Sequence, residues 1–448
     1  MSLSPSAAGP PAESATLPSN ERPALPSRSP LIVVALCFLT LIFDGYDNIV
    51  YGSVVPALLA EPVWHLGPAA VGVIGSYAAV GMLFGALISG PLADRIGRRR
   101  LILIAITWFS VFTALCAVAP TPGVLGLLRL VAGLGLGGVL PSAVALTIEF
   151  APRSRRQLFN AVMSTGFPLG GLLAAVVALL LLPDHGWRAM FLVGLVPVVI
   201  IVPLAAAYLP ESPGHLASRG RRDEAAEIAR RYGLDVAGVQ DEEVASSGLR
   251  AVLTGRNLGP TLLFGVGSFC ALLLTYGLST WLPQIMRQAG YPLGSALQFL
   301  LLLNLGAIVL GVVAGWVADR RGPKFAIICS FAAAGLSLLL LGTGPGAVLV
   351  GIGVFVAGLG GTATQVLVHG YVAAYFSAAN RASALGVVLA LGRLGAIVGP
   401  LLGGLLLASG LAIGGNFLVF AIPALLGLLA TALGPRVVRH TSTQGGSR

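Results

Sequence analysis

Long apolar segments almost without charged residues recur along this chain, and they constrain its fold more than any other feature. Residues 69–93, 101–119 and 158–182 contain no charged side chain, and residues 324–342 contain only Lys324. A helix of about 20 apolar residues crosses the ~30 Å hydrocarbon core of a bilayer. Only 10% of the 448 residues are charged, whereas a soluble domain has roughly a quarter. The chain is therefore an integral membrane protein.

The order of these segments predicts an all-α membrane protein with twelve transmembrane helices in two six-helix, pseudo-symmetric halves. The expected spans are residues 31–55, 69–93, 101–119, 124–149, 158–182, 188–208, 260–283, 294–317, 324–343, 347–370, 382–408 and 415–434. The halves then cover residues 29–209 and 260–435. The charged segment 210–259 joins them as a linker of short amphipathic helices. Residues 1–28, expected to be disordered, and residues 436–448 form tails.

Basic residues are concentrated in alternate loops, which fixes the expected orientation. One set of loops holds Arg95, Arg98, Arg99, Arg100, Arg153, Arg155, Arg156, Arg320, Arg321, Lys324 and Arg381. The opposite loops hold little beyond Arg188 and Arg287. By the positive-inside rule, the linker and both termini are in the cytoplasm. The net charge of +10 is therefore explained by orientation, and we expect no nucleic-acid partner.

The sequence shows no pattern typical of an enzyme or a metal site. The cysteines lie in apolar segments without metal-ligand spacing, where such residues usually pack as small hydrophobes; they are Cys37, Cys116, Cys270 and Cys329. A phosphate-binding Gly-x4-Gly-Lys-Ser/Thr motif is absent from the sequence, which argues against transport driven by ATP hydrolysis. We therefore expect no enzymatic activity, no cofactor and no metal.

An internal repeat relates the two halves. The segment GPLADRIGR at residues 90–98 recurs as GWVADRRGPK at residues 315–324, each at the end of the second span of its half. The fifth spans carry PLGGLL at residues 168–173 and PLLGGLL at residues 400–406. The repeat indicates two halves of the same architecture.

The first of these loops resembles the signature of the major facilitator superfamily. RLVAGLG at residues 129–135 and PESP at residues 210–213 add to the resemblance, which covers the whole chain. It implies parallel halves related by an axis along the membrane normal, with the substrate site between them near the bilayer midplane.

Three further segments are similar to one branch, the aromatic acid:proton symporters. They are DGYD at residues 44–47, STWLP at residues 279–283 and GRLGAIVGP at residues 392–400. The chain departs from this pattern at Ser142, where asparagine is usual in many members. The resemblance implies import of a benzoate-like carboxylate together with a proton into bacteria. We expect a monomer in the bacterial inner membrane. Its expected partners are this small molecule, the proton and membrane lipid.

Four charged residues lie deep inside predicted spans, where each charge costs ~2.5–3.5 kcal/mol or more. Asp44 and Asp47 share one face of the first helix. At ~1.5 Å per residue, Arg393 lies near the depth of Asp44, and Arg129 near that of Asp47. We expect Arg393 to face Asp44 across the halves and Arg129 to pair with Asp47. The arginines would bind a carboxylate through the guanidinium fork, and the aspartates would carry the proton. A static charge network that holds the helices together is the alternative.

Other side chains in the spans are weaker candidates for substrate contacts. Tyr46, Tyr276 and Trp281 would line an aromatic cavity, although Trp281 also suits an interfacial belt. Gln365 and His369 would bind ring hydroxyls or join neighbouring helices by hydrogen bonds, and Ser142 is the polar group that follows Pro141.

Charged residues at the cytoplasmic helix ends predict a gate that opens and closes during alternating access. They are Asp94, Arg95, Gly97, Arg98, Glu149, Arg153, Asp319 and Arg320. A role in orientation and folding alone is the alternative.

The function that we predict is proton-coupled uptake of an aromatic carboxylate such as a benzoate or hydroxybenzoate. Symport of a non-aromatic dicarboxylate or sugar acid would use the same charges. Proton-driven drug efflux is a further alternative, but Arg393 argues against it, since cationic drugs favour acidic residues. A scaffold or receptor would not require four intramembrane charges.

Overall fold

The computed structural model describes residues 29–152, 155–234 and 248–435, and these ranges are helical without a strand. The first half contains α1 (Leu31–Leu59), α2 (Pro68–Ile96), α3 (Arg98–Leu115), α4 (Pro122–Phe150), α5 (Arg156–Ser164), α6 (Gly166–Leu192) and α7 (Val202–Tyr208). The second contains α11 (Leu258–Gln288), α12 (Leu293–Arg321), α13 (Pro323–Gly342), α14 (Ala347–Ala357), α15 (Thr362–Tyr375), α16 (Ala378–Ala408) and α17 (Ile413–Leu433). The predicted all-α class is confirmed.

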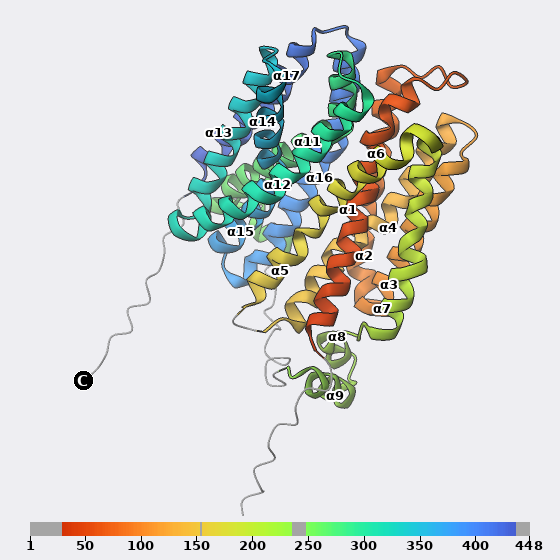
Figure 1. The fold of residues 1–448 in the computed structure, drawn as a ribbon. Coiled ribbons are helices and arrows are strands. Elements are labelled where there is room, and N and C mark those ends of the chain that lie inside the picture. The colour runs from red at the N-terminus through yellow and green to blue at the C-terminus, as the bar shows by residue number, and fades with distance from the viewer. Residues whose placement is uncertain (1–28, 153–154, 235–247, 436–448) are drawn as a thin grey trace, which may run out of the picture.

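The twelve predicted crossings are recovered once one long helical stretch is divided. By length and hydropathy, eleven stretches within the described residues can span a membrane, and Leu158–Tyr208 is one of them with 51 residues. At ~1.5 Å per residue, it is far longer than one crossing requires. The backbone of Gly186 turns within it at φ +71°, and the chain then runs back along the bundle (Figure 1). This stretch therefore makes two crossings.

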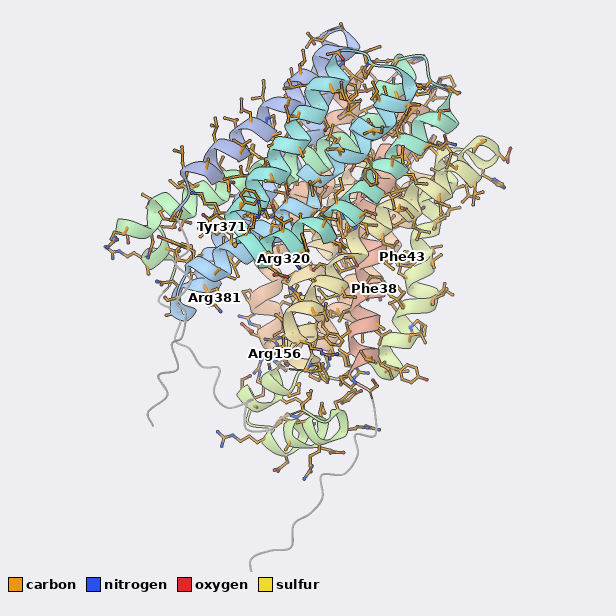
Figure 2. The ribbon with its side chains drawn as sticks, turned by 60° about the vertical axis from the view of Figure 1, so that its left-hand side comes forward. Phe38, Phe43, Arg156, Arg320, Tyr371 and Arg381 are labelled. Atoms are coloured by element: carbon orange, nitrogen blue, oxygen red, sulfur yellow. The ribbon has the colours of Figure 1, made fainter. Side chains whose placement is uncertain are left out.

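Short helices of the linker lie against one end of the bundle. They are α8 (Pro213–Ser218), α9 (Arg222–Tyr232) and α10 (Gly248–Val252), and we call the end that carries α8 and α9 the linker end (Figure 1). Helix α9 is amphipathic, because Ala225, Ala229 and Tyr232 are buried while its charged residues are exposed. Arg156 and Arg381 lie toward the same end of the molecule (Figure 2).

The internal repeat is visible in the backbone. Gly97 after α2 and Gly322 after α12 share one conformation, with φ +93° and ψ of 156° and 154°. Only glycine adopts this region readily, so the repeated loop requires it in both halves. The repeated elements of the fifth spans lie at different levels, however. Gly170 packs against Ile42 in the first half of α1, whereas Gly403 packs against Trp281 near the end of α11.

The halves meet most closely at the end opposite the linker end. A Cβ atom on Gly52 of α1 would collide with the backbone of Ser279 on α11, and one on Gly72 of α2 would collide with Pro400 on α16. Tyr51 donates its hydroxyl to the Val71 carbonyl at 2.7 Å in the same region. Glycine thus permits backbone contact across the halves, which closes this end of the bundle.

Candidate functional site

Asp47 and Arg129 form an ion pair within the first half. Arg129 Nη1 of α4 lies 3.8 Å from Asp47 Oδ2 of α1, and each side chain is 2% exposed. Thr113 of α3 donates its hydroxyl to the other oxygen of Asp47. The Arg129 guanidinium lies over the Tyr51 ring, 5.0 Å from its centroid. The predicted pairing is confirmed, and its partners all come from α1, α3 and α4.

Asp44 and Arg393 approach each other from opposite halves. Asp44 of α1 is buried, Arg393 of α16 is partly exposed, and the two charges interact electrostatically. They make no direct ion pair within the described part of the chain. Arg393 Nη1 instead lies 3.6 Å from the Sδ atom of Met82 on α2, and Asn48 donates its amide to Asp44 Oδ1 at 3.3 Å. Asp44 and Arg393 therefore lie near each other, as predicted, but the described residues show no direct contact between them.

Apolar side chains from both halves pack together next to Arg393. The buried members are Ala79, Leu272, Tyr276 and Ala396, with Phe167 and Ile397 packed against them. The Tyr276 hydroxyl lies 3.8 Å from Met82 Sδ, the atom that Arg393 also contacts. Tyr276 and Arg393 are themselves close enough to interact. A cation beside a flat apolar surface can hold a molecule with one anionic end and one aromatic end.

Gln365 and His369 form a small polar cluster with Ser268. Gln365 Nε2 donates to Ser268 Oγ at 2.8 Å and lies 2.9 Å from His369 Nε2. Gly392, the neighbour of Arg393, packs directly on Ser268. Gln365 Oε1 is buried and has no hydrogen-bond partner among the described residues. The cluster therefore offers an unused acceptor close to Arg393.

The other candidate contacts serve the packing of helices in this structure. Tyr46 donates its hydroxyl to the Met190 carbonyl of α6 at 2.8 Å. Trp281 donates its ring N–H to the Pro400 carbonyl at 2.8 Å and is 0% exposed. Full burial makes the interfacial-belt interpretation of Trp281 wrong. Ser142 is buried within α4.

The predicted gate residues of the first half are tied to the linker. Arg98 of α3 forms an ion pair with Glu149 of α4, and Ser212 donates to the same carboxylate at 2.5 Å. A Cβ atom on Gly97 would collide with the Glu211 carboxylate. The PESP segment therefore packs directly on the repeated loop, a contact that the sequence did not predict.

The remaining gate candidates lie at exposed helix ends. The main-chain carbonyls of Asp94 and Arg95 accept hydrogen bonds from Arg219 Nη2, at 3.0 and 2.8 Å. Their counterparts Asp319 and Arg320 are exposed at the end of α12, where Arg320 lies over the Trp316 ring at 3.9 Å. Arg153 falls outside the described residues, so its role stays a prediction.

Comparison with known proteins decides the family. The sequence pattern of the Major Facilitator Superfamily matches residues 37–357 and 300–448 of this chain. The chain belongs to this superfamily. It is therefore a transporter and not an enzyme, as the sequence analysis predicted.

Relatives within the superfamily are similar to nearly the whole chain. A gentisate transporter of Corynebacterium glutamicum is 41% identical over 90% of this chain and 87% of its own length. A benzoate transport protein of Acinetobacter baylyi is 34% identical over 90% of this chain and 88% of its own length. The 4-hydroxybenzoate transporter PcaK of Pseudomonas aeruginosa is 32% identical over 90% of this chain and 91% of its own length. The predicted resemblance to aromatic acid transporters is confirmed.

A solved structure supports the major facilitator fold. The xylose transporter XylE from E. coli, in a partially occluded inward open conformation, superimposes with a TM-score of 0.76. The match covers 91% of this chain and 100% of XylE, at 18% identity. The predicted fold of two six-helix halves is therefore confirmed.

Sequence reasoning missed several residues around Arg393 in this transporter. Met82, Phe167 and Leu272 are ordinary apolar residues of membrane spans, and Ser268 is a small polar one. Nothing in their type or spacing separates them from the other apolar positions. Their importance comes from the helix packing that places them beside a charged group.

Proposed function

We propose that this transporter imports an aromatic carboxylate together with a proton across a bacterial inner membrane by alternating access. The linker end then faces the cytoplasm, in agreement with the basic loops. The close packing of the halves at the opposite end supports an inward-facing state in this proposal.

The observation that carries the proposal is the position of Arg393. Arg393 is partly exposed at the interface between the halves, and its side chain interacts with the Met82 thioether and the Tyr276 hydroxyl. A thioether is a weak acceptor, so the guanidinium of Arg393 can still bind a carboxylate through two hydrogen bonds. Phe167 and Tyr276 supply aromatic surface for a ring, and Gln365 Oε1 is an unused acceptor for a ring hydroxyl.

Asp44 is the proton carrier in this proposal. It lies within electrostatic reach of Arg393, so an ionised Asp44 competes with a substrate anion for the same cation. Protonation of Asp44 releases Arg393 to the substrate, and loss of the proton after transport favours release. Asp47 is less suited to this role because Arg129 and Thr113 already hold its carboxylate.

Uptake into proteoliposomes tests the proposal. Labelled 4-hydroxybenzoate should accumulate when the outside is acidic, and a protonophore should abolish that accumulation. Unlabelled benzoate and gentisate should compete, whereas succinate and gluconate should not. Accumulation that survives the protonophore but requires sodium would refute proton coupling, and equal competition by succinate would refute the aromatic specificity.

A further inference from the structure

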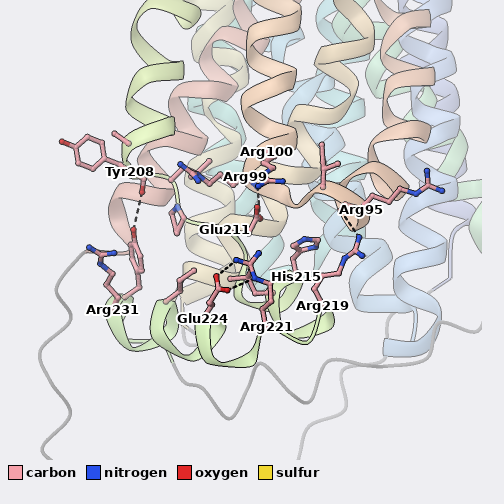
Figure 3. Close-up of a pocket in the computed structure, with 17 residues that line it drawn as sticks. Arg95, Arg99, Arg100, Tyr208, Glu211, His215, Arg219, Arg221, Glu224 and Arg231 are labelled. Atoms are coloured by element: carbon pink, nitrogen blue, oxygen red, sulfur yellow. Dashed lines mark hydrogen bonds and ion pairs between the residues drawn. The ribbon is translucent and has the colours of Figure 1, made fainter.

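A basic cavity lies at the linker end, away from the intramembrane charges. It has a volume of about 560 Å³ and lies between the α2–α3 loop, the end of α7 and the helices α8 and α9 (Figure 3). Six arginines line it against two glutamates: Arg95, Arg99, Arg100, Arg219, Arg221 and Arg231, with Glu211 and Glu224. The cavity therefore has an excess of positive charge.

The two glutamates offset only part of the charge of the six arginines. Glu211 Oε1 accepts the backbone N–H groups of Arg99 and Ser212, each at 3.0 Å, and Glu224 pairs with Arg221 of its own segment. Arg99 Nε is buried and has no hydrogen-bond partner in the described ranges. The same guanidinium donates Nη2 to the Ala206 carbonyl at 2.5 Å. A buried donor without an acceptor is costly, so the free Nε and the net positive charge both favour an anion in this cavity.

The rim of the cavity continues the lipid-facing surface of the bundle. Arg100 lies on the face of α3 that also carries Ile104 and Trp108, which are exposed apolar side chains of the span. Tyr208 ends the segment on which Ile200 and Leu204 are exposed, and α3 packs beside α7. Charge thus begins where the apolar surface ends, which is the level of lipid headgroups.

We propose that this cavity binds the phosphodiester headgroup of an anionic phospholipid, whose acyl chains lie along the apolar faces of α3 and the α7 segment. Guanidinium forks bind phosphate oxygens bidentately, and the apolar faces favour a lipid over a soluble anion. Because the cavity is formed by both the α2–α3 loop and the linker, a bound lipid holds the two together. The proposal does not depend on the transported substrate.

Lipid retention by the purified full-length protein tests this assignment. Native mass spectrometry would compare phosphatidylglycerol with zwitterionic phosphatidylcholine, with thermal unfolding as a second measurement. The variant is Arg100→Gln with Arg231→Gln, because neither side chain makes a hydrogen bond or ion pair within the described residues. The matched control is Arg222→Gln with Arg230→Gln, which removes the same charge from exposed positions of α9 outside the cavity.

The wild type and the control should retain phosphatidylglycerol in preference to phosphatidylcholine. The cavity variant should bind phosphatidylglycerol roughly 25-fold more weakly, because each arginine at a membrane surface contributes about fivefold. Equal retention by the cavity variant and the control would overturn the proposal. Stabilisation by inorganic phosphate equal to that by phosphatidylglycerol would overturn the lipid assignment and leave a site for a soluble anion.

Discussion

The two intramembrane pairs differ in where their partners come from. Arg129 and Asp47 are both 2% exposed and in contact, with every partner in the first half. Arg393 and Asp44 come from different halves and interact without contact, and Arg393 is partly exposed. Charges within one rigid half keep their partners when the halves move, whereas charges across the interface do not. The first pair therefore suits folding, and the second suits transport.

The largest expected effect comes from a substitution that breaks the Asp47–Arg129 pair within the first half. Arg129→Ala leaves the Asp47 carboxylate buried without its cation, which should cost about 3–5 kcal/mol of stability. Arg393→Ala should cost much less, because Arg393 is partly exposed and forms no direct ion pair with a described residue. Unfolding of the purified protein, by heat or detergent titration, measures both. Similar destabilisation by the two substitutions would contradict the comparison.

A second prediction concerns substrate binding at Arg393. Arg393→Lys retains the charge but loses the fork, so the affinity for 4-hydroxybenzoate should fall at least ~30-fold, which is about 2 kcal/mol. Arg129→Lys should have a milder effect on affinity, and calorimetry on purified protein compares the two. The methyl ester should bind poorly to the wild type and should not respond to Arg393→Lys. If Arg393→Ala binds the acid as tightly as wild type, Arg129 becomes the leading candidate.

A third prediction uses pH to distinguish the aspartates. In the wild type, rising pH ionises Asp44, which competes for Arg393, so affinity for the anion should fall by up to about tenfold per pH unit. Asp44→Asn mimics the protonated form and should bind with little dependence on pH. The variant should still exchange substrate across the membrane but fail to accumulate it. A pH dependence that persists in Asp44→Asn and disappears in Asp47→Asn would transfer the coupling role to Asp47.

The smallest expected effect is at Met82, the side chain that Arg393 contacts from the other half. Met82→Leu conserves the volume and removes only the sulfur, so the affinity should change by less than about fivefold. Calorimetry of 4-hydroxybenzoate binding to Met82→Leu and to Arg393→Lys compares the two losses of affinity. A loss as large as that of Arg393→Lys would mean that the thioether is essential for holding the guanidinium in place.

Depth along a helix was enough to predict the Asp47–Arg129 pair and the proximity of Asp44 to Arg393. Helix rise is constant, so residue number converts to level in the bilayer, and the Asp47–Arg129 contact followed from it. The same reasoning could not find the Ser268–Gln365 bond or the contact of Glu211 with Gly97. Such contacts depend on the rotation of each helix about its axis, which packing sets.

The sequence by itself determined the membrane location, the helical class, the repeat and the four intramembrane charges. These follow from hydropathy, from the cost of charge in hydrocarbon and from a glycine that both repeated loops require. Only the tertiary structure decided that Tyr46 and Trp281 join helices and that Arg393 makes no ion pair with the residues that the structure describes. It also placed six arginines around one cavity at the linker end. The physical reason is that apolar and arginine side chains are common at such positions, and only the packing of distant segments gives each one its neighbours.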